Sequence, residues 1–181
     1  MSKNKKDIFL FNKKKEGQHK EYYNNGKIYN ICNYINGKLE GEFRMYHPTG
    51  HIYIICNYKN NKVDGEYKCY HVDGKLLTIS NYRNGDRDGE YKCYRNNRLH
   101  QIYNYKKNLK NGKYELYYDN GQLKEKSNFK NNNMDGNYES YYMDGMLRSI
   151  CNYKNGKLEG EYKLYHDNGQ LMKICNYIKN K

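Results

Sequence analysis

The chain has 181 residues, a formal net charge of +13 and an isoelectric point near 9.3. Its mean hydropathy of −1.28 and hydrophobic content of 36% are usual for disordered chains, yet it holds 24 tyrosines against a single proline. Because disordered chains are poor in aromatic residues, this composition excludes a disordered chain and indicates a folded one packed mostly by tyrosine.

Residues 1–15 form a basic amino-terminal arm in which six lysines face one acidic residue, Asp7. Such an arm suits nucleic acid, an anionic membrane or an acidic protein, and a solvated terminus is the simpler alternative. We expect the apolar residues 8–11 to be a degenerate half-strand that caps one edge of a sheet. They are too few for a signal peptide, and no apolar run approaches the ~18 residues that cross a bilayer. The sequence therefore predicts a cytoplasmic protein, neither secreted nor transmembrane.

Residues 16–178 repeat a unit of about 24 residues, and residues 179–181 form a short carboxy-terminal tail. A first glycine marks each unit, at Gly17, Gly41, Gly65, Gly89, Gly112, Gly136 and Gly160. A tyrosine follows each glycine by five residues, at Tyr22, Tyr46, Tyr70, Tyr94, Tyr117, Tyr141 and Tyr165. An aliphatic residue comes later in the unit, and an asparagine with an aromatic residue closes it.

Turn residues punctuate the units. A second glycine follows the tyrosine by four residues in six units, and Asn97 replaces it in the fourth, since asparagine best tolerates positive φ among the other residues. Asparagine pairs separate the units, at Asn36-Gly37, Asn60-Asn61, Asn84-Gly85, Asn131-Asn132 and Asn155-Gly156. These pairs are typical of type I′ hairpin turns, in which both central residues have positive φ.

The pattern of strand, turn, strand and turn predicts an all-β fold. We expect an elongated antiparallel meander sheet of about seven tandem β-hairpins. Alternation places Tyr67, Cys69 and Leu76 on one face of the sheet, with Tyr70 and Ile79 nearer the other. The sequence leaves open whether the second face meets solvent, a partner or another copy.

The segments Asn155-Gly156-Lys157-Leu158-Glu159-Gly160-Glu161-Tyr162 and Asn36-Gly37-Lys38-Leu39-Glu40-Gly41-Glu42-Phe43 resemble the MORN-repeat variant family. The resemblance covers about residues 16–178. It implies an extended sheet of hairpins used in protein–protein or membrane-proximal scaffolding. In larger relatives such repeats accompany a catalytic domain, and here we expect nothing outside the repeats to be catalytic. The composition, rich in asparagine, lysine and tyrosine, is also similar to that of MORN-variant proteins of giant DNA viruses, a weaker likeness than the repeat itself.

The potential metal-binding and catalytic residues exchange with other residue types in their columns. Cys32, Cys56 and Cys151 share a column with Ser80 and Tyr103, as expected of small packing residues, and no pair has the spacing of a zinc site. The histidine column likewise accepts tyrosine and arginine, and the acidic residues beside the first glycine recur along the sheet. We therefore expect no catalytic residue, no metal, no cofactor and no small-molecule substrate.

A basic column follows the first glycine by three residues, at Lys20, Arg44, Lys68, Lys92 and Lys163, and Glu115 and Glu139 interrupt it. A second basic column follows the closing aromatic residue, at Lys59, Arg83, Lys106, Lys130 and Lys154. These cations suit phosphates or an acidic partner, with the tyrosines of the Tyr22 to Tyr165 column available for stacking. The alternative is that they form cross-strand salt links of little energy with neighbouring glutamates.

The sequence thus predicts a non-catalytic scaffold that binds an unidentified protein through the first basic column and the tyrosine column. The alternative function is peripheral binding of anionic lipid or nucleic acid through the lysine columns and the arm. Association with further copies of the chain also stays open.

Overall fold

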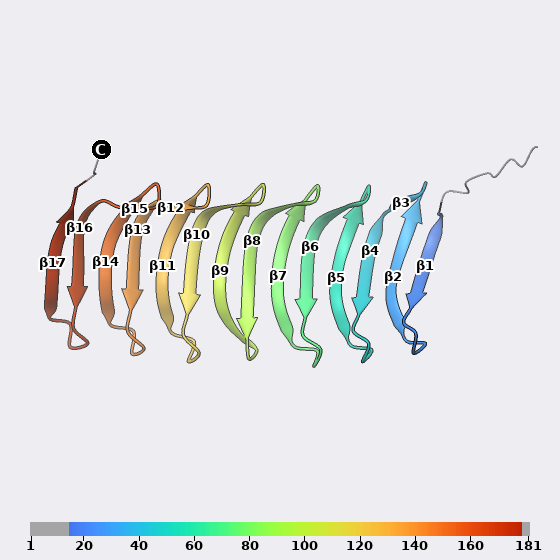
Figure 1. Cartoon of the computed structure of the whole chain (residues 1–181), viewed down its shortest axis with the longest axis horizontal. Helices are drawn as coiled ribbons and strands as arrows, with labels where there is room; N and C mark the ends of the chain where they lie inside the picture. Colours follow the sequence, from blue (N-terminus) through green and yellow to red (C-terminus); the bar gives the residue numbers. More distant parts are fainter. Residues whose placement is uncertain (1–14, 179–181) are drawn as a thin grey trace, which may run out of the picture.

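The computed structural model describes residues 15–178 as one antiparallel sheet of 17 strands, so the all-β prediction is confirmed. The predicted capping half-strand at 8–11, most of the basic arm and the tail at 179–181 lie outside the described residues. The strands follow one another in chain order along the length of an elongated sheet, with β1 at one end and β17 at the other (Figure 1).

The strands are β1 (Gly17–Tyr22), β2 (Ile28–Ile35), β3 (Lys38–Leu39), β4 (Gly41–Tyr46), β5 (Ile52–Lys59), β6 (Lys62–Tyr70), β7 (Leu76–Arg83), β8 (Asp86–Arg95), β9 (Arg98–Lys106), β10 (Leu109–Tyr117), β11 (Leu123–Lys130), β12 (Asn133–Met134), β13 (Gly136–Tyr141), β14 (Leu147–Lys154), β15 (Lys157–Leu158), β16 (Gly160–Tyr165) and β17 (Leu171–Tyr177). The long strands pair with the long strands before and after them in the chain, and the short strands β3, β12 and β15 pair with the strand that precedes each. The short strands β3, β12 and β15 continue across one residue into β4, β13 and β16, and the same stretch is a single strand in β6.

The turns between units have the predicted type I′ geometry. Asn36 and Gly37 have φ of 51° and 78°, and Asn60 and Asn61 have 50° and 66°. The structure adds a turn that the sequence pattern had not marked, at Lys107 and Asn108, with φ of 49° and 65°. In the fourth unit Asn97 has a φ of 62°, which confirms that it replaces a glycine in a left-handed position. The turns between units line the upper edge of Figure 1, and the loops within the hairpins line the lower edge.

A β-bulge in each hairpin decides which side chains share a face. In the third unit Cys69 pairs with Thr78 and Tyr70 pairs with Leu76, which leaves Leu77 as the extra residue. Because directly opposed residues point to the same face, Leu76 lies with Tyr70. The expectation that Leu76 shares a face with Tyr67 and Cys69 is therefore wrong, because simple alternation does not count the extra residue.

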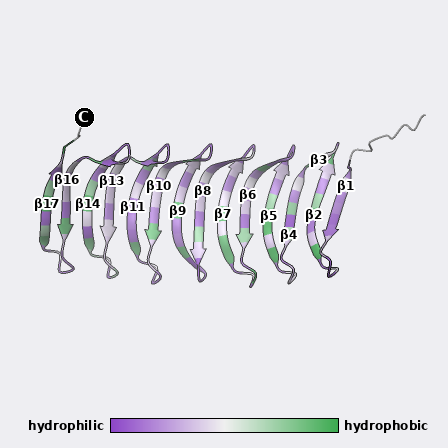
Figure 2. Ribbon diagram, in the orientation of Figure 1, coloured by the Kyte–Doolittle hydropathy of each residue, from purple (hydrophilic) through white to green (hydrophobic). Residues whose placement is uncertain are grey.

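The sheet has two unlike faces. The aromatic face carries the residue two positions after each first glycine and the aromatic residue that closes the unit, as Tyr67 and Tyr82 do. The charged face carries Glu66, Lys68 and Tyr70, together with Ile79 opposite Lys68. Figure 2 shows hydrophilic and hydrophobic residues mixed along the strands, as expected when neighbouring residues point to opposite faces.

The core is a thin layer on the aromatic face. Cys56 and Ser80 are 1% and 2% exposed, and Cys32, Ser127 and Cys151 are also buried in the same column. Most other strand residues are half-buried, as expected of a single sheet. Small side chains in this column leave room for the aromatic rings on either side, which accounts for its exchange of cysteine and serine.

Candidate interaction surfaces

All the site residues predicted from the sequence lie on the charged face. Strand alternation carries each cation and the tyrosine two residues after it to the same side, as for Lys68 and Tyr70. Across the turn between units, an isoleucine pairs with the cation, as Ile55 does with Lys68 and Ile79 with Lys92. The structure therefore brings the two predicted columns together as parallel rows along the sheet.

Four of the five cations of the first basic column are neutralised within their own strand; Lys20 has Gln18 two positions before it in place of a glutamate. Four ion pairs join residues two positions apart: Arg44–Glu42 at 2.7 Å, and Lys68–Glu66, Lys92–Glu90 and Lys163–Glu161 at 2.5 Å. The glutamate raises the pKa of its cation in each pair. The sequence leaves cross-strand salt links as one interpretation of this column. The four ion pairs run along a strand instead. The column consequently presents paired charges rather than a continuous positive stripe.

The charge order on this face inverts in the fifth unit, and the glutamate of the sixth unit pairs with a lysine of the fifth. Lys113 lies 2.9 Å from Glu115, and Lys126 lies 2.9 Å from Glu139 on the adjacent strand. The Tyr117 and Tyr141 hydroxyls donate to these two glutamates. Burial opposes ionisation of Glu139, yet the hydrogen bonds from Tyr141 and Lys126 lower its pKa. The acidic residues that interrupt the basic column thus form a fixed local pattern of opposite sign.

The aromatic face holds a feature that the sequence reasoning missed. In every unit the residue two positions after the first glycine packs against the closing aromatic ring. The pairs are His19–Tyr34, Phe43–Tyr58, Tyr67–Tyr82, Tyr91–Tyr105, Tyr114–Phe129, Tyr138–Tyr153 and Tyr162–Tyr177, with ring centroids 5.1–6.2 Å apart. Burial raises the pKa of Tyr91 and of Tyr138 to about 12. The signal was the Gly-x-aromatic spacing, which recurs in six of the seven units.

A hollow of about 250 Å³ lies on the aromatic face over the fifth and sixth units. Ser140 and Ser149, which pair within the sixth hairpin, line it with their hydroxyls 2.7 Å apart, where other hairpins carry larger pairs such as Met45 with Ile54 and Leu164 with Lys173. Glu125, opposite Ser140, and the Tyr138 ring also line it. The serine pair satisfies its own hydrogen bonds, so the hollow is a gap left by small residues.

The edge of type I′ turns carries a row of cations that we call the basic rim. Its members are exposed and come from both sides of the turns: Lys38, Lys59, Lys62, Arg83, Lys106, Lys107, Lys130, Lys154 and Lys157. Among residues 15–178 the rim forms one ion pair, Lys154–Asp135 at 3.9 Å. Two strands of ~4.8 Å separate equivalent cations, which gives a spacing of about 10 Å along the edge.

The acidic residues next to the first glycine have a structural role on this edge. Glu16, Glu40, Asp64 and Asp135 accept the backbone N–H of the first residue in the following turn, at 2.8–3.1 Å. Their charges therefore lie at the base of the turns. This arrangement explains why acidic residues recur in the column without forming a catalytic carboxylate pair.

The opposite edge joins units through a column that mixes tyrosine and histidine. The Tyr23, Tyr118 and Tyr142 hydroxyls donate to the carbonyl of the next unit's tyrosine at 2.6–2.8 Å. His47 Nε2 lies 3.1 Å from the Tyr70 carbonyl in the same arrangement. The histidines are thus one way of linking units, which agrees with their exchange for tyrosine.

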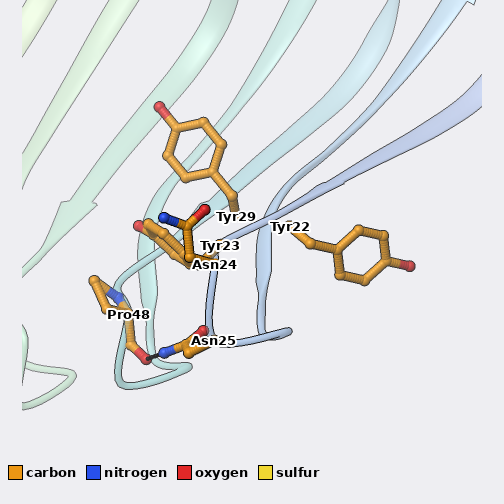
Figure 3. A pocket seen from close by; sticks show the side chains of 6 residues that line it. All are labelled: Tyr22, Tyr23, Asn24, Asn25, Tyr29 and Pro48. Atoms are coloured by element: carbon orange, nitrogen blue, oxygen red, sulfur yellow. Dashed lines mark hydrogen bonds between the residues drawn. The ribbon is translucent and has the colours of Figure 1, made fainter.

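The free end of this edge contains a hollow of about 470 Å³ lined by Tyr22, Tyr23, Asn24, Asn25, Tyr29 and Pro48. In Figure 3, Tyr22 points away from the Tyr23 and Tyr29 side chains, and Asn25 donates to the Pro48 carbonyl. Tyr22 is 59% exposed, whereas its equivalents in the later units are half-buried. The exposed Tyr22 ring therefore marks where a preceding unit would stack.

Burial raises the pKa of the Cys56 and Cys151 thiols to about 11, so both thiols are protonated at neutral pH. Within residues 15–178, no group of three or more histidine, cysteine or acidic residues is placed to hold a metal ion. The same stretch contains no helix of the length and apolarity that cross a membrane.

Comparisons with known proteins identify the repeat. None of the curated proteins compared with the chain matches it. A crystal structure of a GtfA/B complex bound to UDP and GlcNAc aligns at 14% identity with a TM-score of 0.21, over 76% of this chain and 22% of that one. This likeness carries no inference about function, and none of the comparisons supports a viral origin.

The family model described as "MORN repeat variant" matches residues 15–36, 39–60, 63–84, 110–131, 134–155 and 158–179. The stretch it leaves out contains the fourth unit, whose hairpin loop is shortened to Asn96-Asn97. With six matched units and the sheet of paired hairpins described above, the chain belongs to the MORN repeat variant family.

Proposed function

We propose that this protein is a non-catalytic repeat scaffold whose charged face binds another protein. The observation that carries the proposal is the pairing of each cation with a glutamate two residues earlier, beside half-buried tyrosines and isoleucines. A surface with both signs of charge and aromatic rings matches a protein partner, whereas a polyanion is best matched by unpaired cations.

The order of charges gives this face its specificity. Four units present glutamate before lysine or arginine along the strand, and the fifth presents Lys113 before Glu115. A partner with the complementary order would dock in one register, because a shift by one unit would bring like charges together.

Charge reversal on the charged face tests the proposal. Protein partners captured from the native cell by the wild-type chain are expected to be lost by a variant carrying Arg44→Glu, Lys68→Glu and Lys92→Glu. The matched control places three reversals on the basic rim, at Lys59, Arg83 and Lys106, and should retain these partners. Equal capture by wild type and both variants would contradict the charged face as the binding surface.

The basic rim supports a second function, peripheral binding of an anionic lipid surface or nucleic acid. Its exposed cations form a single ion pair among the described residues and recur about every 10 Å. Binding to phosphatidylserine vesicles and to an oligonucleotide should weaken steeply with added salt and in the rim-reversed variant. Affinity that is independent of salt would exclude this function.

Histidine, acidic and cysteine residues often carry catalysis, but in this chain they have structural roles. His47 links two units, the acidic column binds turn amides, and burial raises the pKa of the Cys56 thiol so that it stays protonated. We therefore infer a binding role rather than an enzymatic one, and expect no cofactor or small-molecule substrate.

A further inference from the structure

We propose that the two ends of the sheet are complementary, so that β17 of one copy pairs with β1 of a second copy in a head-to-tail array. This inference goes beyond the proposed scaffold function, because it concerns the ends of the sheet and assigns a second copy of this chain as a partner. It is independent of which face binds another protein.

Both end strands expose the edges that interior strands use for pairing. Within the described residues, β1 pairs only with β2 and β17 pairs only with β16. An unpaired strand edge is a template for another strand. Ile174 is 52% exposed and Leu171 is 51% exposed, whereas their equivalents in the other units are half-buried or buried. The column residues at the ends therefore lack a neighbouring strand.

The six seams between units define the register that a seventh, intermolecular seam would follow. Each seam joins the second strand of one unit to the first strand of the next, as Ile55 to Lys68 and Ile150 to Lys163. β17 is a second strand and β1 is a first strand. The same register places Ile174 opposite Lys20 of the second copy, an isoleucine–lysine pair like those inside the chain.

The adjacent position carries opposite charges at the two ends. Inside the chain this position pairs Asn30 with Met45, Ile54 with Cys69, Thr78 with Cys93, Gln101 with Leu116, Glu125 with Ser140 and Ser149 with Leu164. None of these six pairs at this position joins two charged residues, although the β11–β13 seam does so one position away, at Lys126 and Glu139. At the free ends the same position is Lys173 on β17 and Glu21 on β1, which form an opposite-charge pair when the ends meet.

The loop edge of the last unit also carries the groups that link units. His47 and Asn120 reach the carbonyls of Tyr70 and Met143 in the unit that follows each of them. The equivalents in the last unit are His166 and Asn168. Asn168 accepts the Gln170 N–H at 3.0 Å, as Asn120 accepts the Gln122 N–H at 2.9 Å, so its side chain is already in the linking conformation.

In a head-to-tail seam, His166 and Asn168 would face the carbonyls of Tyr22 and Asn24 in the second copy. Those two residues line the open hollow at the free end of β1 (Figure 3). The seam would thus cover the exposed Tyr22 ring. Because the interface joins two different surfaces, its growth is open-ended unless the rotation closes a ring.

Charge reversal at the two ends tests the pairing in the full-length chain, under reducing conditions that exclude disulfides. Sedimentation velocity should show a mass that grows steadily with wild-type concentration. Lys173→Glu places a second carboxylate opposite Glu21, and Glu21→Lys places a second ammonium group opposite Lys173. Each variant alone should associate about tenfold more weakly, because like charges replace an opposite pair across the strands.

An equimolar mixture of the two single variants gives the decisive result. Each tail in the mixture then meets a head of opposite charge on the other variant, so association should return to the wild-type level. The double variant, with both residues reversed, should also associate as the wild type does. A wild-type chain that stays monomeric, growth that stops at a dimer, or association unaffected by the single reversals would each overturn the proposal.

Discussion

Asn61 forms two hydrogen bonds with Leu39, a residue of the preceding unit. The Leu39 N–H donates to the Asn61 side-chain oxygen at 2.6 Å, and the Asn61 N–H donates to the Leu39 carbonyl at 3.0 Å. Asn108 and Asn132 bind Arg87 and Lys110 in the same way. A turn residue that closes one hairpin therefore also fastens that hairpin to its predecessor, which gives asparagine an advantage over glycine at this position.

Replacing Asn61 with glycine should lower the free energy of unfolding by about 1 kcal/mol. Glycine keeps the positive φ of 66° but removes the side-chain oxygen that Leu39 uses. The urea midpoint, followed by tyrosine fluorescence, measures the change. Asn97→Gly is the matched control, because Asn97 also has positive φ but accepts no side-chain bond from a neighbouring unit in the described part of the chain. A similar loss in both variants would assign the effect to backbone entropy.

Tyr118→Phe should weaken the link between the fifth and sixth units. The Tyr118 hydroxyl donates to the Tyr141 carbonyl at 2.8 Å, and phenylalanine leaves this carbonyl without its partner. We expect a loss of about 1 kcal/mol and faster amide hydrogen exchange in β13 and β14. Tyr22→Phe, at an exposed ring, should change neither measurement. Unchanged exchange in Tyr118→Phe would mean that strand pairing alone holds the units together.

The free energy of unfolding of the array should fall in alkaline solution, because buried thiol and tyrosine groups must ionise there. Burial raises the pKa of Cys56 from 9.0 to about 11 and of Tyr138 from 10.0 to about 12. The folded chain therefore holds these protons more tightly than the unfolded chain. Their contribution is complete below pH 9 and is lost as the pH rises from 9 to 12.

Urea midpoints between pH 7 and pH 12 check this expectation, with tyrosinate absorbance as a second readout. Tyr138→Phe should reduce the alkaline loss, since phenylalanine already occupies this column as Phe43. Tyr22→Phe serves as the exposed control. A urea midpoint that stays constant up to pH 12 would show that the aromatic face does not resist ionisation.

Removing the glutamates of the four ion pairs should turn the charged face into a cation stripe. The variant combines Glu42→Gln, Glu66→Gln, Glu90→Gln and Glu161→Gln, and leaves all the lysines and arginines in place. It should elute from heparin at higher salt than the wild type, with little change in stability because exposed pairs contribute little. The control for net charge replaces the same number of acidic residues beside the first glycine, with Glu16→Gln, Glu40→Gln, Asp64→Asn and Asp135→Asn.

The two sets of variants should differ in stability. The acidic residues beside the first glycine accept turn amides, so their loss should destabilise the sheet, whereas the charged-face glutamates pair only with partly exposed cations. If both sets bind heparin equally, net charge alone governs polyanion binding, and the ion pairs on the charged face have no special effect.

Local chemistry made much of the fold predictable from the sequence. Asparagine and glycine pairs mark type I′ turns, because few other residues adopt positive φ at both positions. The period of two along strands and the recurrence of columns then fix hairpins in series. The turn at Lys107 and Asn108 escaped this reasoning because lysine is not a turn residue, although it adopts a φ of 49° there.

Side-chain geometry decided which residues the cations of the first basic column contact. The sequence placed Lys68 near several glutamates, and the structure shows that the partner is Glu66 on the same strand and face. The pairing of Tyr67 with Tyr82 likewise depends on a diagonal contact between strands, which a column-by-column comparison does not reveal.

The sequence by itself determined the repeat, its turns and the residue types of each column, because φ preference and alternation act within a few residues. Only the tertiary structure decided that Leu76 shares a face with Tyr70, since one extra residue in each bulge reverses the alternation after it. It also set Lys173 and Glu21 in equivalent register positions of β17 and β1, each of which pairs with one strand within residues 15–178.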